Sequence, residues 1–197
     1  ILRCKRKGWY LGENMYVWLA AFLYMLFISL ISLIAVLPTV STNRLWGEIA
    51  GDFVVNQRSL IPVYTWGLVM PVRVIQNYYP LAAFMYTFIT GWLSIVFIGK
   101  LMYLLNLKIG KKTIGISAAV FFIMLDPVAV YFTNFKQYGL FYVSPINWSS
   151  LENINTVSGY PHLSGEYMFT MYIILIGVES LLSYICSIKM DIEIKIV

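Results

Sequence analysis

Four apolar stretches, separated by more polar segments, dominate the pattern of this chain. They cover residues 15–37, 81–105, 114–132 and 167–188. Each provides about the 20 residues that a helix needs to cross the hydrocarbon core of a bilayer. Since a helix satisfies its own backbone groups in lipid, the pattern predicts an all-α integral membrane protein: a bundle of four transmembrane helices.

Prolines and charged residues suggest where these helices end. The first stretch stops at Pro38, and the second follows Pro80, which suits a first helical turn. Lys100 lies inside the second stretch, so we expect its long side chain to reach toward the lipid headgroups. Asp126-Pro127 interrupts the third stretch, and one alternative is that it opens a turn near the outer surface.

The outer connections, residues 41–80 and 133–166, are long and rich in tyrosine and tryptophan, which favour the membrane–water interface. Residues 61–79 within the first are apolar but contain two prolines and Arg73, and an arginine is costly at mid-bilayer. We therefore expect a surface or re-entrant outer element there, not a fifth crossing.

The overall composition supports this interpretation. Hydrophobic residues make up 60% of the chain, charged residues 12%, and the mean hydropathy is +0.76. This excludes an ordinary soluble domain, and two cysteines exclude a disulfide-rich secreted one. We expect residues 1–197 to form a single transmembrane domain. Because the chain opens on Ile1 and a basic cluster, we expect it to begin within a longer protein.

The distribution of basic residues predicts the orientation. Ten of the 14 fall in or beside segments 1–14, 106–113 and 189–197, and four fall in the other connections. Basic residues concentrate on the cytoplasmic side, so the sequence predicts a multi-pass plasma-membrane protein with both ends in the cytoplasm. Cys4 and Cys186 are then expected to be reduced thiols.

No recognised catalytic or ligand-binding motif is present. The sequence lacks a phosphate-binding loop, a dinucleotide fingerprint and a paired-cysteine or HExxH metal motif. The single histidine, His162, is predicted to be a solvated loop residue. We therefore expect no catalytic residue, cofactor or metal in this chain, and no nucleic-acid partner, since the basic residues sort by membrane side.

Asp126 and Glu179 are the acids inside predicted spans, where an unpaired charge is costly. They could line a polar substrate path, or could hydrogen-bond between helices with one acid protonated; for Asp126, a turn near the surface is a further alternative. Small residues near Glu179 let a second helix approach closely, so we predict that this carboxyl group faces the bundle. The small residues are Gly177, Ser180 and Ser183.

The segment before the first span admits two interpretations. It combines four basic residues with Trp9, Tyr10 and Leu11. It is either a juxtamembrane basic cluster with an aromatic anchor, or a short interfacial helix that docks on a cytoplasmic partner.

Three stretches resemble membrane subunits of ABC exporters from Gram-positive bacteria, of the small type-two kind linked to antimicrobial-peptide export or self-immunity. They are the Arg3-x-x-Arg6-Lys7-x-Trp9-x-Leu11-Gly12 run, the run from Ser144 to Leu151, and the ending from Lys189 to Ile194. Such permeases usually have six spans, whereas four are predicted here, which fits two spans preceding Ile1.

The resemblance implies a separate cytoplasmic ATPase subunit, a second permease copy or homologue, and surrounding lipid. It implies that residues 1–12 and 106–113 face the ATPase, and that the contacts are Arg3, Arg6, Lys7, Trp9, Lys108, Lys111 and Lys112. The expected substrate is a peptide or an amphipathic, lipid-like molecule.

Two other functions remain open on the sequence. One is a non-transporting immunity or scaffold protein that binds a peptide or partner through its aromatic outer loops. The other is an intramembrane enzyme that uses Asp126 and Glu179.

Single cysteines test the topology. In a background lacking Cys4 and Cys186, cysteines at positions 42 and 156 should react with an impermeant thiol reagent added to intact cells, and a cysteine at Lys111 should not. Labelling of all three from one side would contradict four spans.

Overall fold

The computed structural model describes residues 6–36, 46, 72–110, 112–133, 142–151 and 164–189. In this part of the chain the structure is helical, with short turns and no strand. Its elements in chain order are α1 (Arg6–Val36), α3 (Val72–Asn77), α4 (Pro80–Ile109), α5 (Lys112–Thr133), the 3-10 helix η4 (Asn147–Ser149) and α6 (Gly165–Lys189).

Three of these helices are long and apolar enough to cross a membrane. The apolar spans are Lys7–Ile34 in α1, Pro80–Ile109 in α4 and Gly165–Ile188 in α6, whereas the apolar run of α5, Thr113–Val128, is shorter. The structure is therefore compatible with the predicted helical membrane protein.

The helices match the predicted stretches, with differences at their ends. Pro80 lies in the first turn of α4, as predicted. Residues 6–14 continue directly into α1, so they do not form a separate interfacial helix. Of the predicted outer element, residues 72–79 are described; they hold α3, whose six residues are too few to cross a bilayer. Residues 61–71 lie outside the described ranges.

Helix α5 continues through Pro127 to Thr133, so the predicted span 114–132 is one helix and the alternative of a turn at Asp126-Pro127 is wrong. A proline inside a helix removes one backbone donor and leaves the carbonyl four residues earlier, here that of Ile123, without its helical partner. Membrane helices tolerate such a proline where neighbouring groups compensate.

A tight turn joins α4 to α5. Gly110 adopts a left-handed conformation (φ 71°), and its N–H donates to the Asn106 carbonyl, which ends α4. The Asn106 side chain then accepts from the Gly115 N–H at 3.2 Å, in the first turns of α5. One asparagine thus serves both helix ends.

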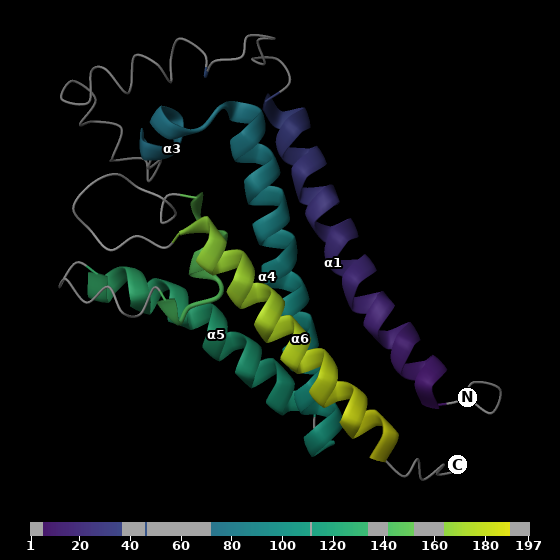
Figure 1. Cartoon of the computed structure of the whole chain (residues 1–197). Helices are drawn as coiled ribbons and strands as arrows, with labels where there is room; N and C mark the ends of the chain where they lie inside the picture. Colours follow the sequence, from purple (N-terminus) through teal and green to yellow (C-terminus); the bar gives the residue numbers. More distant parts are fainter. Residues whose placement is uncertain are drawn as a thin grey trace.

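Helix α4 is the centre of the assembly, and α1, α5 and α6 each pack against it. The start of α1, the α4–α5 turn and the end of α6 lie at one end of the molecule (Figure 1). The other end carries α3 and η4. The start of α1 and the end of α6 therefore lie at the same end of the described structure (Figure 1).

Two glycines allow α1 to approach α4 closely. A Cβ atom at Gly91 would lie 2.7 Å from Cε of Met25, and one at Gly99 would lie 3.0 Å from Cγ1 of Val17. Between these contacts the rings of Trp18 and Trp92 meet edge to face at 5.3 Å. A larger residue at Gly91 would therefore have to displace Met25.

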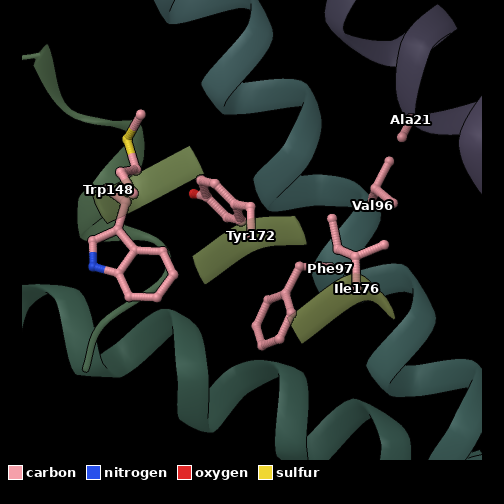
Figure 2. Packing of buried hydrophobic residues seen from close by; sticks show 7 residues of the cluster. Ala21, Val96, Phe97, Trp148, Tyr172 and Ile176 are labelled. Carbon is pink, nitrogen blue, oxygen red and sulfur yellow. The ribbon is translucent and has the colours of Figure 1, made fainter. Parts of the chain in front are cut away.

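The core lies where α4, α6 and the segment 142–151 meet (Figure 2). Trp148 of this segment is 1% exposed and packs edge to face on Tyr172, with ring centroids 5.2 Å apart. The Tyr172 hydroxyl donates to the Pro145 carbonyl at 2.6 Å and lies 2.5 Å from the Ser94 hydroxyl. The core cluster consists of Ala21, Val96, Phe97, Trp148, Met168, Tyr172 and Ile176.

The segment 142–151 is therefore part of the interior of the fold. It is the same stretch, Ser144 to Leu151, on which part of the exporter resemblance rests. Thr90 of α4 also holds it, because its hydroxyl lies 3.4 Å from the Ser149 carbonyl. We conclude that this stretch joins α4 to α6 at the end opposite the termini.

Tyr172→Phe tests this contact. The substitution keeps the ring but leaves the buried Pro145 carbonyl without its donor, so we expect a loss of about 1–2 kcal/mol in the free energy of unfolding in detergent. Tyr16→Phe, at a tyrosine 68% exposed, is the matched control and should change little. Equal stability of both variants would contradict the role of Tyr172.

Candidate functional site

A buried lysine joins three helices. Lys100 of α4 is 4% exposed. Its ammonium group donates to Oδ1 of Asn14 on α1 and to Oγ of Ser180 on α6, both at 2.5 Å. It also lies over the Trp18 ring, 5.8 Å from the centroid. We call Asn14, Lys100, Glu179 and Ser180 the three-helix polar cluster.

The expectation that Lys100 reaches toward the headgroups is therefore wrong. A lysine extends to the membrane surface when nothing nearer satisfies its charge. Here α1 begins early enough to place Asn14 beside it, and α6 offers a hydroxyl group. Charge-assisted hydrogen bonds of this kind compensate part of the cost of burial.

Glu179 faces the bundle, as predicted, and is 6% exposed. It interacts electrostatically with Lys100, but the two groups form no direct ion pair. Its Oε2 atom is buried and accepts no hydrogen bond from any described residue. Ser183 is buried beside it, whereas Gly177 is exposed and makes no close helix contact. The prediction that Gly177 lies on the packed face is therefore wrong.

The hydroxyl groups around the cluster donate to backbone carbonyls. Ser180 donates to Ile176 and Ser183 to Glu179, each on α6 itself. Tyr10 of α1 donates to the Ser180 carbonyl at 2.8 Å. These bonds leave the Glu179 carboxyl group without a hydroxyl donor from its own helix.

Tyr103 extends the polar region along α4 toward the end that carries the termini. Its hydroxyl group is buried without a hydrogen-bond partner among the described residues. It interacts electrostatically with Glu13 and Tyr10 of α1, and its ring lies 6.3 Å from that of Trp9.

The second predicted acid, Asp126, does not join this cluster. It lies on α5, is half-buried, and has no charged partner in the described ranges. Since α5 packs mainly against α4, the structure does not bring Asp126 and Glu179 together.

The predicted ATPase contacts are placed in part. Lys7 and Trp9 are exposed near the start of α1, and Lys108 is exposed in the last turn of α4. Arg6 and Lys112 begin α1 and α5, but their side chains are outside the described part. Arg3 and Lys111 lie wholly outside it.

Asn14 and Lys100 were missed as site residues. Asn14 falls in a segment assigned to the cytoplasm. Lys100 carried a usable signal, because it is the cation within an otherwise apolar stretch, and such residues mark functional sites in membrane proteins. No group of His, Cys, Asp and Glu suited to a metal occurs among the described residues. The cluster combines a buried ammonium group, a buried carboxyl group and two neutral hydrogen-bonding side chains.

Lys100→Met tests whether the buried ammonium group stabilises the bundle. It removes both hydrogen bonds while keeping an unbranched side chain, so we expect a loss of about 1–3 kcal/mol in the free energy of unfolding. Lys108→Met, at the exposed lysine of the same helix, should stay within about 0.5 kcal/mol of the parent. A negligible effect of Lys100→Met would favour a lysine that reaches the headgroups.

Comparison with known proteins adds no relative: no family model, no curated protein and no solved structure matches this chain.

Proposed function

We propose that this chain is the permease subunit of an ABC-type exporter, energised by a separate cytoplasmic ATPase and completed by a second permease copy or homologue. In this proposal α1, α4, α5 and α6 each cross the plasma membrane. The exported substrate is a peptide or another amphipathic, lipid-like molecule.

The observation that carries the proposal is the shared location of three basic elements. The start of α1, the α4–α5 turn and the end of α6 lie at one end (Figure 1), and most of the chain's lysines and arginines belong to these elements and their continuations. Lys7 and Lys108 are exposed there. By the distribution of basic residues this end is cytoplasmic, and it is where an ATPase would dock.

Contacts from this end lead to the three-helix polar cluster. Trp9 packs on Tyr103, one turn from Lys100 on α4, and Tyr10 binds the Ser180 backbone on α6. Closure of an ATP-bound ATPase against the start of α1 would therefore shift the contact among α1, α4 and α6. Such a shift could rock the helices between inward- and outward-facing states.

The outer surface of α1 offers a place for the second permease. Almost all of its apolar residues are at least partly exposed, and large side chains such as Leu23 and Phe27 are among them. Lipid or another membrane helix must cover such a surface.

The alternative, a scaffold that binds partners through aromatic outer loops, has less support. Trp148 is almost fully buried. Tyr142 packs on the Tyr167 ring at 5.5 Å, and its carbonyl accepts from the Tyr167 hydroxyl. These aromatic side chains pack within the chain and are not presented to a partner.

The test is purification of the tagged chain from native membranes, followed by identification of bound proteins and measurement of ATP hydrolysis in nanodiscs. We expect a P-loop ATPase to co-purify and its activity to rise when it binds the chain. Lys7→Glu combined with Lys108→Glu should weaken binding several-fold, because it replaces two exposed positive charges of the docking end with negative ones.

Arg73→Glu is the matched control, because Arg73 belongs to α3 at the opposite end (Figure 1). Absence of any ATPase, or equal binding by the double variant and the control, would contradict the proposal. Capture of an extracellular peptide without an ATPase would favour the scaffold.

A further inference from the structure

The three-helix polar cluster contains one carboxylate oxygen that the protein does not satisfy. Glu179 is 6% exposed, and its Oε2 atom has no donor among the described residues. A buried carboxylate without donors is strongly disfavoured, so it must gain a proton or a cationic partner.

The neighbouring cation is already engaged. Lys100 donates to Asn14 and Ser180 and places its remaining side toward the Trp18 ring. It therefore contributes electrostatic attraction to Glu179 without a direct bond. Ser180 and Ser183 give their hydroxyl hydrogens to backbone carbonyls.

We propose that Glu179 is a proton-binding site, and that its protonation decides which groups Lys100 binds. With a proton on Glu179 the carboxyl group is neutral, and Lys100 stays on Asn14 and Ser180, as in the structure. Loss of that proton to water leaves a carboxylate, and the ammonium group moves to it. Because Glu179 and Ser180 are consecutive, Lys100 reaches either by rotating its own side chain.

The exchange has a consequence for helix packing. The Lys100–Asn14 hydrogen bond is a polar link between α4 and α1, so its loss weakens the contact of α1 with α4. Titratable groups beside the cluster in the described residues are Tyr103 on α4, which interacts with Glu13 and Tyr10 of α1, and Tyr184 on α6, whose ring packs on Tyr10. Proton occupancy of Glu179 is therefore coupled to the contact between α1 and the rest of the bundle. The inference does not depend on an ATPase, since it concerns this chain alone.

Infrared spectroscopy of the purified chain in nanodiscs, recorded as a function of pH, tests the site directly. We expect a protonated-carboxyl C=O band at neutral pH that is lost in Glu179→Gln and kept in Glu166→Gln. Glu166 is the matched control, because it lies exposed in the first turn of the same helix. A band unchanged by Glu179→Gln would overturn the proposal.

Two further variants test the exchange by the direction of their effects on the Glu179 band. Lys100→Met removes the positive neighbour, so the band should persist to higher pH. Asn14→Ala frees the ammonium group to bind the carboxylate, so the band should disappear at lower pH. Lys108→Met should leave unchanged the pH at which half of the Glu179 band is lost, which we call its midpoint.

Shifts of the midpoint in opposite directions in Lys100→Met and Asn14→Ala support the exchange. Displacements of the same sign, or none, overturn it. If Lys100→Met does not yield folded protein, Asn14→Ala decides alone, because a purely structural asparagine would leave the midpoint where it is in the parent protein.

Discussion

The burial of one ammonium group constrains the arrangement of the three helices that contact it. Lys100 is in an apolar helix, and its charge can be tolerated there only if other helices bring acceptors to it. Asn14 on α1 and Ser180 on α6 do so. Without the early start of α1 at Arg6, the asparagine would not be helical and the lysine would lack its partner on α1. The length of α1, the register of α1 against α4 and the inward face of α6 are thus linked by one side chain.

Apolar and aromatic packing completes the assembly from both ends. The glycines of α4 bring α1 close enough for Trp18 to lie beside Lys100. At the opposite end, Trp148 and the Tyr172 hydroxyl join the segment 142–151 to α4 and α6. The contacts on α6 therefore divide into a mainly aromatic region around Tyr172 and a polar region around Ser180. A proton-dependent exchange in the polar region could change the hold on α1 while the aromatic region keeps α4 and α6 together.

The helices themselves were predictable because their apolar runs are long, and Glu179 was predictable because a carboxyl group in such a run must face protein. The three-helix polar cluster was not predictable, for reasons specific to Asn14 and Lys100. Asn14 lies before the most apolar part of its helix, so hydropathy assigned it to the cytoplasm. Lys100 lies near enough to the helix end for reach toward the headgroups to be the simpler expectation. Pro127 lies inside the predicted third stretch, and α5 continues through it rather than opening the turn that was the alternative there. Each outcome depends on which side chain a neighbouring helix provides, and the periodicity of one segment does not contain that information.

The most direct test of the central claim is a double-mutant cycle between Asn14→Ala and Lys100→Met, measured as the free energy of unfolding in detergent. If the ammonium group bonds to Asn14 across the helix interface, the cycle should give a coupling energy of about 1–2 kcal/mol. The same cycle with Lys108→Met in place of Lys100→Met should give none. Additive effects of Asn14→Ala and Lys100→Met would show that Lys100 does not join α1 to α4.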